Sequence, residues 1–204
     1  MNKNFLAIAL IGILGVALIW VLFFWNPTTE NNRVEHQTLE LSAKPTGGDF
    51  TVEIQNKDLS LQDLRGKVVL LYFGYTQCPD ICPTSLSLMT QALNQLSEDE
   101  LKSVNGLFVS VDPNRDNTTR LEEYTHYFHP NIIGATAEKD EIDKITKMYG
   151  ASYRIVESDS AMGYIVDHSS YTYVIDKKGK LRYTLAHGTH SDKILKVVRE
   201  LLAE

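Results

Sequence analysis

The stretch "KVVLLYFGYTQCPDICPT", Lys67 to Thr84, joins an apolar run to the two cysteines of the chain. Its first nine residues are mostly β-branched, leucine and aromatic residues, which is typical of a strand buried on both faces of a parallel sheet. Cys78 and Cys82 follow at once, four positions apart, and each precedes a proline. Proline suits the first position of a helix and disfavours helical dihedrals at the residue before it. We therefore predict a buried strand, a turn that holds Cys78, and a helix from Pro83 that Cys82 caps.

Strand and helix patterns alternate through the rest of the chain. A hairpin strand is expected near residues 50–54, and residues 154–166 read as a hairpin or loop excursion. The further expected strands are 106–112, 131–136, 171–176 and 181–187, and the further expected helices are 117–129, 139–150 and 191–202, the last with Ser191 as its N-cap. Alternation of this kind predicts a layered α/β domain. The closing hairpin and helix indicate that part of the sheet is antiparallel.

Composition limits the class of protein. A chain of 204 residues accommodates one domain plus an appendage. Its 43% hydrophobic and 23% charged residues are ordinary for a globular protein. A net charge of -6, a pI near 5.5 and the lack of a basic stripe argue against a nucleic-acid partner.

The N-terminal region predicts a membrane anchor. Phe5 to Trp25 form 21 consecutive apolar or glycine residues, which as a helix reach about 30 Å, the thickness of the hydrocarbon core of a bilayer. The alternative is a cleaved signal peptide, but its apolar region is usually about 7–15 residues and ends in a small-x-small site. We therefore expect residues 1–25 to be a transmembrane anchor, 26–44 a tether and 45–204 the folded domain.

Charges beside this apolar run predict its orientation. Lys3 is the one charged residue before the run, and Glu30 is the first charged residue after it. The positive-inside tendency then leaves the N-terminus in the cytoplasm. A mitochondrial presequence would be rich in arginine, whereas the first arginine here is Arg33. The expected location is a bacterial inner membrane, crossed once, with the C-terminal domain in the periplasm.

Three interpretations of the cysteine pair compete. A structural disulfide would close a very short loop and so would stabilise little. A thiol–disulfide catalyst typically has Cys-x-x-Cys, but three residues intervene here, and no proline follows Pro130 to supply the cis-proline of thioredoxin-type enzymes. A metal site needs a third ligand from elsewhere in the fold. A helix N-terminus favours thiolates, which serves the catalyst and the metal site alike.

His168 is the candidate third ligand. It lies in "VDHSS", just before the expected strand 171–176. In a thioredoxin-like sheet, the loop before that strand would approach the cysteine loop. Two thiolates and one imidazole suit a soft metal such as Cu(I), and the imidazole also tolerates Cu(II). The alternative is a histidine that is merely hydrogen-bonded, and spacing alone leaves both interpretations open.

Three blocks in order, "YFGYTQCPDICPTSL", "VSVDPNRD" and "VDHSSYTYVID", resemble the Sco/SenC family of copper-binding cytochrome c oxidase assembly proteins. The resemblance runs from about Gly47 to the C-terminus. It implies a thioredoxin-like fold, with a mixed sheet flanked by helices, and one copper ion held by Cys78, Cys82 and His168. It further implies a copper chaperone, not an enzyme, whose partner is the copper-receiving subunit of cytochrome c oxidase or another copper protein. The alternative it allows is a thiol–disulfide reductase that acts on the cysteines of that partner.

Some residues near these blocks have open roles. Asp112 and Asp116 of "DPNRD" are either turn and capping residues or groups beside the metal, and Asp80 is a turn residue or tunes the charge of the site. Asp167 is a candidate partner for the ligand beside it. "LAHGTH" carries two histidines that the family resemblance does not explain, His187 and His190, which form either a polar turn or a secondary metal contact.

Overall fold

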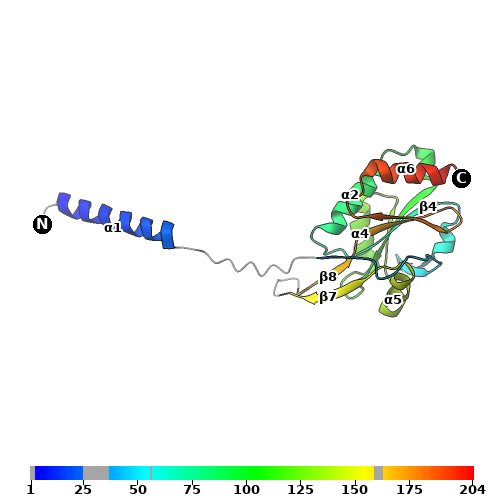
Figure 1. The fold of residues 1–204 in the computed structure, drawn as a ribbon, viewed down its shortest axis with the longest axis horizontal. Coiled ribbons are helices and arrows are strands. Elements are labelled where there is room, and N and C mark those ends of the chain that lie inside the picture. Colours follow the sequence, from blue (N-terminus) through cyan, green and yellow to red (C-terminus); the bar gives the residue numbers. More distant parts are fainter. Residues whose placement is uncertain (1–2, 25–36, 56, 159–162) are drawn as a thin grey trace. The chain divides into compact units, whose positions relative to one another are not determined.

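The computed structural model describes residues 3–24, 37–55, 57–158 and 163–204 (Figure 1). The chain divides into two compact units, Met1–Arg33 and Val34–Glu204.

The described residues of the first unit form helix α1, Lys3–Phe24. Large apolar side chains are exposed along it, among them Leu10, Trp20 and Phe23. Over the residues that the structure describes, no helix is both long and apolar enough to cross a membrane. Trp25 and residues 26–36 of the expected tether lie outside the described residues. The anchor therefore stays a prediction.

A five-stranded sheet forms the centre of the second unit. Its order is β10 (Leu181–Ala186), β9 (Tyr171–Ile175), β4 (Val68–Gly74), β5 (Val104–Ser110) and β6 (Ile132–Ala135). β4, β5 and β6 are parallel, whereas β9 is antiparallel to both β4 and β10. The expectation of a mixed sheet flanked by helices is confirmed, and all seven residues of β4 are buried as its composition predicts.

Helices cover both faces of this sheet (Figure 1). The helices of the second unit are α2 (Ile81–Leu93), the short α3 (Glu98–Leu101), α4 (Thr118–Phe128), α5 (Lys139–Met148) and α6 (Ser191–Leu202), with a 3₁₀ turn, η1, at Leu61–Leu64. α2 and α6 lie side by side, on the face opposite α5. Alternate side chains of β4 meet the two faces, since the ring of Phe73 packs on Tyr149 at the end of α5 whereas Gly74 lies against Cys82 of α2.

Two smaller sheets complete the unit. β2 (Thr51–Ile54) and β3 (Lys57–Ser60) form the hairpin that the sequence predicts. β7 (Tyr153–Glu157) and β8 (Tyr164–Ser169) form a second hairpin, and β1 (Thr38–Leu39) pairs in parallel with the other edge of β8.

His168 therefore lies on a strand and not in the loop that the sequence predicted. Its backbone pairs with Thr38 of β1 on one side and with Tyr153 of β7 on the other. The physical reason is that β8 has a neighbour along both edges, so the segment before β9 is held in extended form.

Residues 37–44, which the sequence assigned to the tether, are hydrogen-bonded to the domain. The Gln37 N–H donates to Asp167 Oδ1 at 2.8 Å, and the Ser42 N–H donates to the carbonyl of Gly150 at 2.8 Å. These residues fall within the second compact unit, Val34–Glu204.

Candidate metal centre

The cysteine loop leads directly from β4 into α2. The helix begins at Ile81 with Asp80 as its N-cap, so Cys82 lies within the first turn and does not cap the helix as predicted. Proline at position 83 is tolerated there because the first N–H groups of a helix have no intrahelical acceptor. The Cys82 N–H donates to Cys78 Sγ at 3.4 Å. The sulfur of Cys78 thus accepts a hydrogen bond from one of the backbone N–H groups that have no intrahelical acceptor at the start of α2.

The structure brings the three predicted ligands together. His168 Nε2 lies 3.3 Å from Cys82 Sγ and 4.0 Å from Cys78 Sγ, and the three donor atoms lie within 4.8 Å of one another. Bonds from a metal to sulfur and nitrogen are about 2.3 and 2.0 Å, so two ligands of one ion lie roughly 3–4 Å apart. The spacing fits a single ion held by three donors.

The three candidate ligands differ in their exposure to solvent. The side chains of Cys82 and His168 are fully buried, whereas Cys78 remains 5% exposed. Both cysteines are free thiols. Within the described parts of the chain, no carboxylate joins this cluster. The cluster therefore offers sulfur and nitrogen donors alone, and it opens to solvent only at Cys78.

Contacts of the imidazole fix its direction. His168 Nδ1 lies 3.2 Å from the carbonyl oxygen of Ser169, and a proton on Nδ1 donated to that oxygen leaves Nε2 as the nitrogen that faces the sulfurs. The ring also packs edge to face on Tyr72 at 6.2 Å and on Tyr75 at 6.0 Å, centroid to centroid. These contacts hold the imidazole in an orientation suited to a ligand.

Gly74, the last residue of β4, makes room for the sulfur of Cys82. A Cβ atom at this position would lie 2.6 Å from Cys82 Sγ and 2.8 Å from the ring of Phe108. Ordinary contacts of a Cβ atom are 3.4–4 Å. No larger residue therefore fits unless the sulfur moves.

Burial decides the acidity of Cys82. Burial first, and then the neighbouring Cys78, raise the pKa of the Cys82 thiol well above its usual range. In the metal-free protein, burial therefore opposes the thiolate that the helix N-terminus favours. A bound cation would stabilise the thiolate form of Cys82, because thiols release their protons when they bind a metal.

Asp116 braces the start of the cysteine loop. Its buried carboxylate accepts the N–H of Thr76 at 2.9 Å, the hydroxyl of Thr76 at 2.5 Å and the hydroxyl of Ser110 at 2.7 Å. Three donors from two segments hold one carboxylate, so the loop before Cys78 is tied to the end of β5. This role is structural, in line with the turn-type role that the sequence left open.

Asp112 connects the same region to β8. Its carboxylate accepts the Arg115 Nε–H at 2.5 Å and the hydroxyl of Tyr164 at 2.7 Å. The Arg115 guanidinium lies 3.6 Å above the Tyr164 ring and donates to the Tyr164 carbonyl. The connection after β5 is thus attached to the strand that carries His168.

Among the described residues, the carboxylates of the other two aspartates near the site, Asp80 and Asp167, do not belong to the three-ligand cluster. Asp80 is exposed and makes no side-chain cap bond. Asp167 accepts from Arg154 at 2.8 Å and from the Gln37 N–H. Because neighbouring side chains of a strand point to opposite faces, its carboxylate is directed away from the imidazole of His168.

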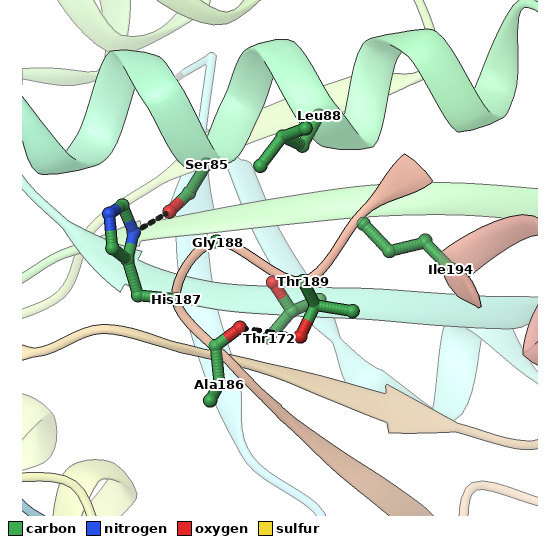
Figure 2. A pocket seen from close by; sticks show the side chains of 8 residues that line it. All are labelled: Ser85, Leu88, Thr172, Ala186, His187, Gly188, Thr189 and Ile194. Carbon is green, nitrogen blue, oxygen red and sulfur yellow. Dashed lines mark hydrogen bonds between the residues drawn. The ribbon is translucent and has the colours of Figure 1, made fainter. Parts of the chain in front are cut away.

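The two histidines near the C-terminus lie in the turn between β10 and α6. His187 Nδ1 is 3.0 Å from the Ser85 hydroxyl of α2, beside a small cavity (Figure 2). His190 caps α6 by accepting the Asp192 N–H at 3.4 Å, so the predicted cap, Ser191, is instead the first helical residue. Neither histidine belongs to the three-ligand cluster.

Known proteins are similar to this chain in sequence. A family model described as SCO1/SenC matches residues 39–203. An SCO2-like protein of Rickettsia conorii is 41% identical over 136 residues, which is 66% of each chain. A mitochondrial SCO2 homolog of Bos taurus is 32% identical over all of this chain and 76% of its own length.

Solved structures of Sco proteins are similar to this chain in fold as well as in sequence. Copper-bound ScoI of Arabidopsis thaliana has a TM-score of 0.69 at 32% identity and covers 78% of this chain and 99% of its own. Copper-bound yeast Sco1 has a TM-score of 0.69 at 31% identity and covers 78% of this chain and 90% of its own.

Proposed function

Because the chain belongs to the SCO1/SenC family, we propose that it is a copper chaperone that assists assembly of the copper centre of cytochrome c oxidase. Cys78, Cys82 and His168 hold one copper ion in its thioredoxin-like domain. The observation that carries this proposal is the convergence of two sulfurs and one imidazole nitrogen within 4.8 Å. Similar structures with copper bound, from Arabidopsis thaliana and yeast, support it.

The donor set suits copper in either oxidation state. Thiolates favour Cu(I), and the imidazole also accommodates Cu(II). A structural zinc site is almost always closed by four protein ligands, whereas this cluster has three over the described residues. Three donors leave room for a fourth from another protein.

Delivery to a partner starts at Cys78. It is the ligand with exposed surface, since Cys82 and His168 are fully buried. An incoming thiol of the copper-receiving subunit, or of another copper protein, joins the ion at that side before Cys78 leaves. Ligand exchange of this kind passes the ion on without releasing it to solvent.

The protein is proposed to be anchored to a bacterial inner membrane. The support is the run of 21 apolar residues from Phe5 to Trp25 together with the single lysine before it. The domain then lies in the periplasm, where it meets the oxidase. Protease added to spheroplasts should digest the domain, and protection of the domain would contradict this topology.

The test is copper binding by the chain from Val34 onward. Titration with Cu(I) against a chelator should give one ion per chain, and His168→Ala should weaken affinity by at least about 100-fold, since even changes beside metal ligands cost 10–100-fold. His187→Ala is the matched control, because this histidine lies outside the cluster. An unchanged stoichiometry and affinity in His168→Ala would refute the three-ligand site.

A thiol–disulfide reductase remains the second candidate function. A related Sco structure at 26% identity and TM-score 0.59 is described as containing a disulfide switch, and the sulfurs of Cys78 and Cys82 lie close enough here to approach each other. The two functions separate in cells. A reductase keeps oxidase assembly in His168→Ala and loses it in Cys78→Ser, whereas a chaperone loses it in both.

A further inference from the structure

Two different sheets contribute the candidate ligands. Cys78 and Cys82 follow β4 of the five-stranded sheet, whereas His168 lies on β8 of the three-stranded sheet. The C-terminal end of β8 continues through Ser170 into β9, which pairs with β4. The other end of β8 begins at Tyr164. The distance between the imidazole and the sulfurs therefore depends on what holds Tyr164 to the cysteine loop.

The side chain of Arg115 makes that connection. Its guanidinium stacks on the Tyr164 ring, 3.6 Å from the centroid, and donates to the Tyr164 carbonyl oxygen at 3.0 Å. The same guanidinium lies 5.6 Å from the centroid of the Tyr75 ring and donates to Gln77 Oε1 at 3.4 Å. Tyr75 and Gln77 both belong to the loop between β4 and α2. One side chain thus contacts both β8 and the loop that carries the cysteines.

Tyr75 extends this connection to the imidazole. Its hydroxyl accepts the Val166 N–H of β8 at 3.3 Å, and its ring packs edge to face on His168. Arg115 is itself held by Asp112, whose carboxylate is 2% exposed and accepts the Nε–H. Charge-assisted hydrogen bonds of this kind are about twice as strong as neutral ones. Arg115 is therefore fixed in place, and it acts on the ligand through its neighbours and not by direct contact.

We propose that Arg115 is a positioning residue of the metal centre, which sets the distance between His168 and the two sulfurs by tying the start of β8 to the cysteine loop. This inference rests on the proposed function. Arginine suits the role because its planar guanidinium stacks on an aromatic ring while its rigid fork of N–H groups donates to several acceptors. The alternative is an ion pair with Asp112 that stabilises the turn after β5 and has no influence on the ligands.

The experiment compares Arg115→Lys with Arg182→Lys in the full-length protein in detergent. Lysine keeps the positive charge but loses the planar fork, so it cannot stack on Tyr164 and bond to the same acceptors at once. Arg182 is the matched control, because its partners, Asp176 and Glu204, lie outside the three-ligand cluster.

Two readouts separate positioning from a purely structural role. The first is hydrogen exchange of residues 164–169 in the metal-free protein, which measures how firmly β8 is held. The second is Cu(I) affinity by competition with a chelator, measured for Arg115→Lys alone and together with His168→Ala as a double-mutant cycle. His168→Ala keeps both sulfur ligands, so a weaker chelator measures its affinity.

Arg115→Lys should speed exchange of residues 164–169 at least about tenfold, since local opening costs less once charge-assisted hydrogen bonds are lost. Cu(I) affinity should fall about tenfold, as for other groups beside metal ligands. In His168→Ala, the same substitution should cause no further loss of affinity, because no imidazole remains to be positioned. Arg182→Lys should leave both readouts at their wild-type values.

The inference is overturned if either readout of Arg115→Lys matches the wild type, or if Arg182→Lys changes them equally. An equal loss of affinity with and without His168 also overturns it, because that result indicates a structural ion pair. A wild-type protein that takes up no copper overturns the proposed function as well, whereas normal loading with an unaffected Arg115→Lys overturns the inference alone.

Urea unfolding of the metal-free variants checks the fold, and Tyr164→Leu decides the question if Arg115→Lys does not fold. Tyr164→Leu removes the ring beneath the guanidinium and leaves the ion pair of Arg115 with Asp112. Loss of the cation–π contact should weaken Cu(I) binding about threefold, and only while His168 is present. Unchanged affinity in Tyr164→Leu, or an equal loss without His168, overturns the inference.

Discussion

Replacement of Gly74 by alanine puts a methyl group where the Cys82 sulfur now lies. The new Cβ would be 2.6 Å from Cys82 Sγ and 2.8 Å from the Phe108 ring, against an ordinary contact of 3.4–4 Å. Gly74 does not have a positive φ, so alanine fits the backbone and the effect is one of space alone. The sulfur has to move away to restore an ordinary contact. Its side chain has a single χ angle, so such a movement pulls the sulfur off its staggered rotamer or shifts the backbone of α2.

Two opposing terms set the change in stability. Overpacking of a core costs about 1–3 kcal/mol, and a glycine-to-alanine change returns about 0.4–1 kcal/mol by restricting the unfolded chain. The net loss in the free energy of unfolding is therefore about 1–2 kcal/mol. Copper affinity should fall more sharply, by about 10–100-fold, as for other changes beside metal ligands.

Gly106→Ala is the matched control on the neighbouring strand. Its Cβ would meet Ile132 at 2.9 Å and Met89 Sδ at 3.0 Å, so it overpacks the same core without touching a ligand. Urea unfolding of the metal-free chains and Cu(I) competition titrations measure both effects. Gly74→Ala with wild-type copper affinity, or Gly106→Ala with an equal loss of affinity, would refute the reasoning.

Two further predictions concern the fold. A chain that begins at Pro45 should have a free energy of unfolding about 3 kcal/mol lower than one that begins at Val34. It loses several hydrogen bonds between residues 37–44 and the domain, each worth about 0.5–1.5 kcal/mol. Equal urea midpoints for the two chains would contradict this prediction. Burial lowers the pKa of His129, so the unfolded chain binds its proton first, and stability should fall as the pH drops from about 6.5 toward that lowered pKa. His129→Gln should flatten this part of the profile of unfolding free energy against pH, and an unchanged slope would disprove the assignment.

Local composition was sufficient for the central elements of the fold. β4 and β5 are buried on both faces, and their β-branched and aromatic runs predict this without any tertiary information. The placement of Cys78 in a turn before a helix was also confirmed. The start of α2 was wrong by two residues because a proline preference for the first helical position does not exclude other positions in the first turn.

Pairings between distant segments could not be predicted in this way. β1 is two residues long, and it pairs with β8, which lies far from it in the sequence. No local sequence pattern predicts such a pairing. His168 lies on a strand as a result of that pairing. Since the pairing was not predicted, the sequence placed His168 in a loop instead. The spacing of the sequence left the role of His168 open, and the family resemblance, not the spacing, singled it out as a ligand.

A usable signal for Tyr72 and Gly74 was nevertheless present. Residues two apart on a strand share a face, so a strand that ends beside Cys78 directs both toward the same helix. The pattern identifies the face but not the distance. The close approach of Gly74 to Cys82 depends on how α2 packs on the sheet, which only the three-dimensional structure shows.

X-ray absorption spectroscopy of the Cu(I)-loaded protein measures the ligands of the ion directly. The account predicts two sulfur neighbours and one nitrogen neighbour per copper, with the nitrogen absent in His168→Ala. A shell that lacks either sulfur, or one that is identical in wild type and His168→Ala, would contradict it.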